Sequence, residues 1–209
     1  MSTPYELTGR TRQKARTRAA MVAAARELLA EGVDPTVEQA AERAAVSRTT
    51  AYRYFQNQRA LLLASYPELD APSLLDGDAP ADPAERLELV TERVARQLLE
   101  HEPELRAMLR LSLESPPPGR GALPLRRGRV IGWLEDALAP LRGRMAEPEL
   151  RRLVLAIRAT LGIEALVWLT DVGGLSREDA ADLMRSSART LLRAALADVD
   201  GHGRQRPEG

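Results

Sequence analysis

The chain has 209 residues, of which 44% are hydrophobic and 29% charged, a composition typical of a globular protein with a sizeable buried core. It contains no cysteine, which excludes disulfides and thiolate metal sites and predicts a cytoplasmic location. No apolar run approaches the roughly 18 residues of a membrane span, so we expect no membrane partner.

The net charge of zero hides an asymmetry between the two ends of the chain. Residues 1–60 contain ten Arg and Lys against six Asp and Glu, whereas the rest contains twenty against twenty-four. A basic run without any acid lies near the start, at Arg10, Arg12, Lys14, Arg16 and Arg18. This pattern indicates a polyanion as partner of the N-terminal end, and its alternative is a solvated helix face.

The hydrophobic periodicity is helical throughout and shows no period-2 strand, which predicts an all-α fold. A first helix is expected over about 11–31, with Gly32 as its stop. Its predicted core face consists of Ala15, Ala19, Val22, Ala23 and Leu29.

Two short helices follow. Thr36 and Gln39 form a capping-box pattern that predicts a helix over about 37–44, and Ser47 is a good N-cap for a third helix over about 48–54. The tight link 45–47 between them makes this pair a helix-turn-helix candidate. A fourth helix is expected to start at Asn57 and to be curtailed by Pro67.

The segment 69–83 is rich in Asp, Pro, Gly and Ala and is predicted to be a linker. Asp82 and Pro83 then start a helix to about residue 100. A break is expected at 115–121 and disorder at the tail 201–209. Further helices are predicted over about 103–113, 124–142, 148–170 and 177–198, and Ser176 with Asp179 is expected to start the last of them.

The segment 148–170 has apolar residues pointing in nearly every direction, which is typical of a helix enclosed on all sides. Small residues at Ala156, Ala159 and Gly162 would let another helix approach closely. We therefore expect a homodimer formed through the helices at 148–170 and 177–198. The alternative is a buried central helix of a monomer.

Residues 46–55 concentrate three of the chain's five Tyr and Phe beside arginines and threonines. On a helix beginning at Arg48, an arginine can bond guanine O6 and N7 in a fork, and threonines can meet bases. Tyrosine hydroxyls can bond phosphates. Ala51 and Phe55 would face the core. The alternative is a small polar helix with half-buried tyrosines.

The segment 18–62 resembles the N-terminal domain of the tetracycline-repressor (TetR) family of bacterial transcriptional regulators. The resemblance is carried by Gly32, by valine–serine–arginine–threonine–threonine at 46–50, by tyrosine–x–tyrosine–phenylalanine at 52–55, and by the later asparagine and leucine pair. The family usually has Gly at the position of Ala45 and Lys at the position of Gln58. The DNA-contacting positions that it implies are Thr36, Arg48, Thr49, Thr50, Tyr52, Arg53, Tyr54 and Gln58.

The resemblance also implies a homodimeric regulator, most simply a repressor that releases operator DNA when a small molecule binds its second domain. The DNA-binding domain would comprise residues 1–65, and the dimerisation and effector domain residues 66–209. The alternative is an all-α dimeric interaction or small-molecule-binding module without sequence-specific DNA binding.

An enzyme is not expected, because the sequence has no Gly-rich phosphate loop, no metal-ligand spacing and only two distant histidines, at 101 and 202. We therefore predict no catalytic residue, metal or cofactor. A cavity between helices could be lined by large side chains of the second domain, although plain core packing is the alternative for each. The candidates are His101, Met108, Leu111, Trp133 and Trp168.

Overall fold

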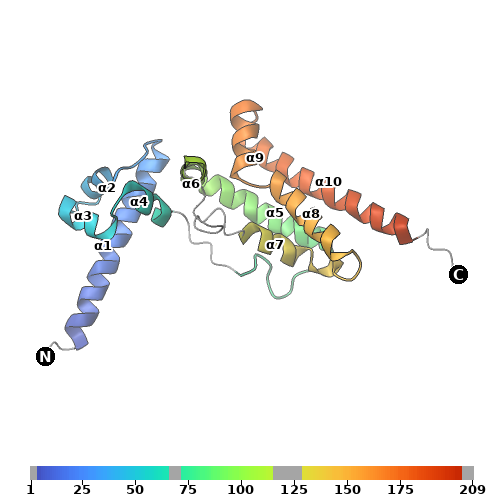
Figure 1. Ribbon diagram of the computed structural model, residues 1–209, viewed down its shortest axis with the longest axis horizontal. Coiled ribbons are helices and arrows are strands. Elements are labelled where there is room, and N and C mark those ends of the chain that lie inside the picture. The colour runs from blue at the N-terminus through green and yellow to red at the C-terminus, as the bar shows by residue number, and fades with distance from the viewer. Residues whose placement is uncertain (1–3, 66–71, 115–128, 204–209) are drawn as a thin grey trace. The chain divides into compact units, whose positions relative to one another are not determined.

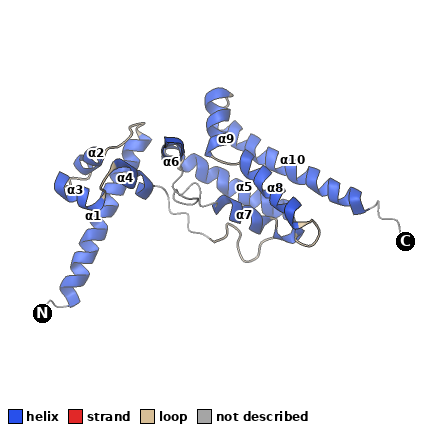
Figure 2. Cartoon of the chain, viewed as in Figure 1, coloured by secondary structure: helices blue, strands red, loops and turns tan. Residues whose placement is uncertain are grey.

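The computed structural model describes residues 4–65, 72–114 and 129–203, with side chains for 12–65, 72–113 and 129–198, and these residues contain helices and no strand (Figure 2). The all-α prediction is confirmed. The elements are α1 (Pro4–Ala30), α2 (Val37–Arg43), α3 (Arg48–Tyr54), α4 (Gln58–Ser65), α5 (Pro83–Glu100), α6 (Glu102–Glu114), α7 (Arg129–Ala137), the 3₁₀ turn η2 (Ala139–Leu141), α8 (Glu147–Thr160), α9 (Ile163–Val167), the π-helical turn η3 (Trp168–Val172) and α10 (Arg177–Gly203) (Figure 1).

The described residues form two compact units that are not continuous in sequence. The first comes from residues 1–68 and 101–127, and the second from residues 69–100 and 128–209. The sequence-based division at residue 65 differs from this grouping, because α6 packs on α1 and α4. Its Met108 and Leu111 share a buried cluster with Leu29 and Leu62. The functional division at residue 65 stays a prediction.

In the first unit, α1 packs on α2 and α4, and its N-terminal half extends beyond these helices (Figure 1). The predicted core face of α1 is partly wrong, since Ala15, Ala19 and Ala23 are exposed. The first two lie on the extending half, where no helix covers them. The buried face of α1 instead lies further along the helix, with the spacing of one helical stripe. It is formed by Met21, Val22, Ala24, Ala25, Leu28 and Leu29.

The end of α1 is closed as the sequence predicts. Gly32 has a positive φ of 77°, its amide donates to the carbonyl of Leu29 at 3.0 Å, and the amide of Val33 donates to Leu28 at 2.8 Å. This pair of bonds is a Schellman motif, in which glycine takes the left-handed position without the penalty of a Cβ atom. The turn leads directly to the cap of α2.

In the second unit, α10 packs on α5 and α8, and α7 packs on α5 and α8. The helix starts follow the predicted caps. The amide of Ala84 donates to Asp82 Oδ1 at 3.2 Å, and the amide of Asp179 donates to Ser176 Oγ at 3.0 Å. The expected helix 124–142 is shorter, since α7 ends at Ala137 and the chain tightens into η2.

The segment 148–170 is not one helix, contrary to the prediction. The backbone is extended at Gly162 between α8 and α9. Arg158 occupies the space that a side chain at 162 would need, because a Cβ there would lie 2.2 Å from the guanidinium. The same guanidinium donates to the carbonyl of Leu161 at 3.2 Å and pairs with Glu164 at 3.4 Å. α8 ends at Thr160, Leu161 already has non-helical dihedrals, and Gly162 leaves room for this ion pair beside the break.

The segment Glu147–Val172 has the length and hydropathy of a membrane-spanning helix, with a mean hydropathy of 1.7 over its most apolar window. From the sequence we expect no apolar run close to the length of a membrane span, and this segment corrects that expectation. A core helix of a soluble protein meets the same test, so one segment is weak support for a membrane span. Here the backbone breaks at Gly162, and α8 packs on α7 and α10.

Several sequence-based expectations fall wholly or partly outside the described residues. These are the end of α4 at Pro67, residues 69–71 of the linker, the break at 115–121, residues 124–128 of the expected helix and the tail from 204. Within the tail, residues 201–203 continue α10, which corrects the predicted disorder there. The expected linker is described over 72–82, where it forms bends and turns without a helix.

Candidate nucleic-acid interface

The turn between α2 and α3 is a second Schellman motif. The amide of Ala45 donates to Glu42 at 3.1 Å, and that of Val46 donates to Ala41 at 2.8 Å. Ala45 takes the left-handed position with φ of 53°, as the resemblance implies for a position that is usually glycine. Val46 packs against the core of the first unit. This geometry reverses the chain tightly and sets α3 against α2.

The helix α3 has one buried and one exposed face. Ser47 caps it by accepting from the amide of Thr50 at 3.3 Å. Ala51 and Phe55, which caps the C-terminal end of α3, are buried in the core, which confirms their predicted role. The opposite face exposes Arg48, Thr49 and Arg53. Local capping and two core side chains therefore present the predicted DNA-contacting face to solvent.

A carboxylate of α2 joins two of the predicted DNA contacts. Glu38 Oε1 accepts from Arg48 Nη2 at 2.7 Å and also from the hydroxyl of Tyr52. The hydroxyl of Tyr52 has a single proton, so it cannot donate to a phosphate while it donates to Glu38. By contrast, neither Thr49 nor Arg53 has a side-chain hydrogen bond or ion pair among the residues that the structure describes.

This cluster favours an ionised carboxylate. The hydrogen bond from Tyr52 and a backbone hydrogen bond at Glu38 itself, followed by the charge and hydrogen bond of Arg48, outweigh desolvation and hold the pKa of Glu38 below its usual range. The same bond to Glu38 raises the pKa of Tyr52, because the carboxylate favours the protonated phenol. Near neutral pH, Glu38 of α2 therefore places a negative charge directly beside Arg48 of α3.

The remaining predicted contacts have structural roles of their own. Thr36 and Gln39 form both bonds of the capping box, at 3.1 and 2.8 Å, as predicted. Two amides of the α2 N-terminus are thus already satisfied. Thr50 accepts a hydrogen bond from Ser47 at 2.8 Å, and Tyr54 packs partly against the core. Gln58 is the first residue of α4 and is half-buried.

The basic run lies on the extending half of α1, where Arg12, Lys14, Arg16 and Arg18 are exposed. Residues four apart share a helix face, so Arg12 and Arg16 form one row and Lys14 and Arg18 another. The guanidinium carbon of Arg18 lies 5.6 Å from the centre of the Phe55 ring. The row of Lys14 and Arg18 is therefore the one on the side of α3.

The comparison with known families decides the class of this domain. The sequence model of the family described as "Bacterial regulatory proteins, tetR family" matches residues 21–65. Residues 21–65 therefore form an N-terminal domain of the TetR family. The N-terminal helices of the chain form the helix-turn-helix DNA-binding domain of a transcriptional regulator. No curated protein matches the chain.

The five candidate effector residues of the second domain predicted from the sequence are not brought together in one site. His101 precedes α6, and Met108 and Leu111 lie in the core of the first unit. The two tryptophans belong to the second unit, where Trp133 is 3% exposed and Trp168 is 60% exposed. No group of three His, Asp or Glu that could hold a metal occurs among the described residues.

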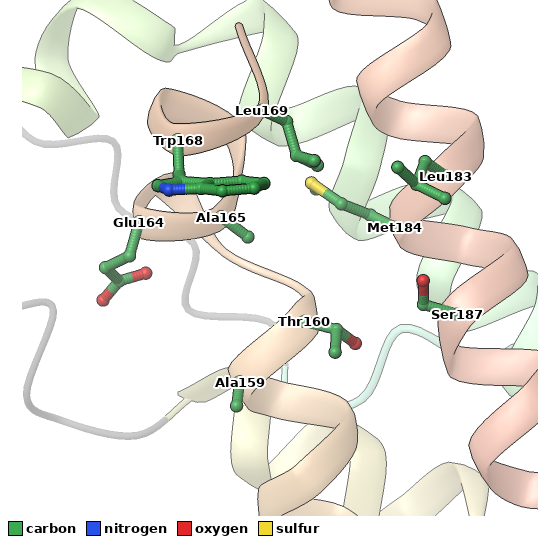
Figure 3. Close-up of a pocket in the computed structure, with 9 residues that line it drawn as sticks. All are labelled: Ala159, Thr160, Glu164, Ala165, Trp168, Leu169, Leu183, Met184 and Ser187. Atoms are coloured by element: carbon green, nitrogen blue, oxygen red, sulfur yellow. The ribbon is translucent and has the colours of Figure 1, made fainter. Parts of the chain in front are cut away.

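Of the five, Trp168 lines a hollow of about 440 Å³ in the second unit (Figure 3). Its walls come from α8, α9, η3 and α10, and the indole of Trp168 and the side chain of Leu169 lie opposite Met184 and Leu183. The lining residues are Ala159, Thr160, Glu164, Ala165, Trp168, Leu169, Leu183, Met184 and Ser187. The hollow is mainly apolar and lies on the elements predicted to form the dimer.

Glu38 is a residue of this candidate site that the sequence did not indicate. It precedes Arg48 by ten positions and belongs to another helix, so no local pattern pairs the two residues. Only the crossing of α2 and α3 brings the carboxylate between Arg48 and Tyr52. The acidic residue in the first turn of α2 was visible in the sequence, but it is equally typical of a helix start.

Proposed function

We propose that this protein is a homodimeric repressor that binds a near-palindromic operator through α3 and releases it when a small molecule binds the second unit. The observation that supports operator binding is the exposed row of Arg48, Thr49 and Arg53 opposite the buried Ala51. In helix-turn-helix proteins, the N-terminal residues of the second helix contact base edges in the major groove. A cytoplasmic location is part of the same proposal.

Two substitutions separate base reading from phosphate binding. Arg48→Ala should weaken binding to the preferred duplex by about 1–3 kcal/mol and relax the base choice there. Replacing Lys14 and Arg18, the row on the side of α3, together by Ala should weaken binding to all duplexes alike and flatten the salt dependence, because fewer counterions are released. Fluorescence anisotropy with DNA flanking the coding region, and with random duplexes, measures both.

Arg96→Ala is the matched control, since this exposed arginine lies on α5 in the second unit. It should leave both affinities unchanged. An equal loss on specific and random DNA from Arg48→Ala would refute the role of Arg48 as a base reader. If the wild-type protein bound no duplex, the alternative of an all-α module without sequence-specific DNA binding would take precedence.

The dimer is supported by apolar side chains that one chain leaves exposed. Leu155 on α8, Trp168 on η3 and Leu183 on α10 are 44%, 60% and 44% exposed. They belong to the segments from which the sequence predicts the dimer. The elements that carry them are in contact, since α10 packs on both α8 and η3, and large apolar side chains exposed on neighbouring elements are typical of a surface that a partner covers. A homodimer would also place two copies of α3 for the two halves of an operator.

Ligand control predicts a reciprocal coupling. A compound that binds the second unit and releases DNA must itself be weakened by DNA by the same factor, typically about 5–150-fold. The Trp133→Phe variant leaves Trp168 as the single indole, so its fluorescence can screen a compound library and then report each affinity with and without duplex. Equal affinities in both titrations would rule out allosteric release by that compound.

A further inference from the structure

We propose that Glu38 is a positioning residue that makes Arg48 select guanine over phosphate. This inference rests on the proposed sequence-specific DNA binding. It starts from the single carboxylate oxygen that receives Arg48 Nη2 at 2.7 Å and the Tyr52 hydroxyl. Because Arg48 and Tyr52 are one turn apart on α3, they hold this oxygen from two sides and fix the orientation of the carboxylate.

The pairing leaves Arg48 able to read a base. A guanidinium has five N–H donors in a planar fork, and the bond to Glu38 uses one of them. The side chain of Arg48 is 75% exposed, so its other donors remain accessible. Guanine O6 and N7 are uncharged acceptors, which a guanidinium can bond in a fork while it keeps its carboxylate partner. Glu38 then restricts the rotamers of Arg48 and supports the fork.

Phosphate is a poorer partner for the same pair. Its attraction to Arg48 is mainly the attraction of opposite charges, and the charge of Glu38 offsets that of the arginine. The carboxylate also repels a phosphate that approaches it. Since the pair is largely exposed, Glu38 does not prevent DNA binding. It lowers the sequence-independent part of the affinity more than the part that reads guanine.

The test compares Glu38→Gln with Glu42→Gln, which removes the same charge from an exposed position one turn along α2. The probes are a random-sequence duplex pool of about 30 bp and the duplex that the wild-type protein enriches from it. We expect Glu38→Gln to bind the random pool about threefold more tightly than Glu42→Gln, the scale of an exposed ion pair. Its salt dependence should steepen by about one phosphate contact.

On the enriched duplex, Glu38→Gln should gain no more than Glu42→Gln, and its preference for guanine at the Arg48 position should weaken. Glu38→Asp keeps the charge but shortens the reach, and it should weaken the same preference. In an Arg48→Ala background, Glu38→Gln and Glu42→Gln should act alike. Circular dichroism melting of each variant checks that the domain remains folded.

Two outcomes separate this inference from the proposed function. If the wild-type protein enriches no sequence, the proposed function fails and the inference fails with it. If a sequence is enriched but Glu38→Gln and Glu42→Gln have the same affinities and the same base preference, the inference alone is overturned. Retention of the full guanine preference by Glu38→Asp would also overturn it, because position would then not matter.

Discussion

At the scale of single residues, the two Schellman turns of the first unit differ in one respect. Gly32 closes α1 with φ of 77°, and Ala45 closes α2 with φ of 53°. Both turns have the same pair of backbone bonds. The left-handed conformation costs a residue with a Cβ atom roughly 1–2 kcal/mol, whereas glycine adopts it without this cost. The turn that precedes α3 therefore stores strain.

Ala45→Gly should stabilise the protein by up to about 1 kcal/mol, since the relief of strain exceeds the larger unfolded-state entropy of glycine. Ala44→Gly is the control. Ala44 has an ordinary φ of −82°, so this substitution relieves no strain and should make the protein less stable. Thermal and urea unfolding measure both changes. A lower melting temperature for Ala45→Gly would show that the turn does not hold this conformation in solution.

At the scale of elements, helices of the second unit are joined by a charged cluster. Glu88 on α5 accepts from Arg185 and, at 3.0 Å, from Arg189, both on α10. Burial acts to raise the pKa of Glu88, but the hydrogen bonds and charges of the two arginines outweigh it and hold the pKa below its usual range. The carboxylate therefore stabilises the packing of α5 on α10 when it is ionised.

This cluster predicts a pH-dependent stability. Because the pKa of Glu88 is lower in the folded than in the unfolded state, its contribution is present above about pH 4.3 and is lost as the pH falls through the folded pKa. Glu88→Gln should cost about 1–2 kcal/mol near pH 7. The difference from wild type should shrink at acidic pH.

Glu92→Gln, an exposed change one turn along α5, is the control and should have little effect at either pH. Urea unfolding at several pH values gives the comparison. A loss of stability from Glu88→Gln that did not change with pH would show that packing, and not ionisation, is responsible.

At the scale of the whole molecule, the proposed dimer determines whether two copies of α3 can act together. Leu183→Glu on α10 should weaken self-association at least about tenfold, since it places a charge in the apolar surface. Light scattering during gel filtration should then move from twice the chain mass of 22.9 kDa towards that mass. Leu89→Glu is the control, because Leu89 is 38% exposed on α5, outside the proposed surface.

A wild-type protein with the mass of a single chain at micromolar concentration would contradict the dimer. An equal effect of Leu183→Glu and Leu89→Glu would place the interface elsewhere or indicate general destabilisation. Operator affinity should fall together with dimerisation for Leu183→Glu, because each copy of α3 would then bind one half-site alone.

The sequence by itself determined the features that depend on neighbouring residues. The caps at Thr36, Ser47 and Ser176 and the bounds of α3 follow from bonds that span three to five positions, whereas the positive φ at Ala45 is implied by the family resemblance alone. Such bonds form within one helix end or turn, so residue types and spacing are sufficient to predict them. The exposed face of α3 follows from the same local periodicity.

Only the tertiary structure decided which helices meet. It placed α6 with α1 and α4, put Glu38 between Arg48 and Tyr52, and left Trp168 exposed while burying Trp133. It also showed Arg158 in the space beside Gly162, where the sequence predicts one continuous helix. These contacts depend on the crossing of separate helices, and many pairings of amphipathic helices satisfy the same hydrophobic pattern.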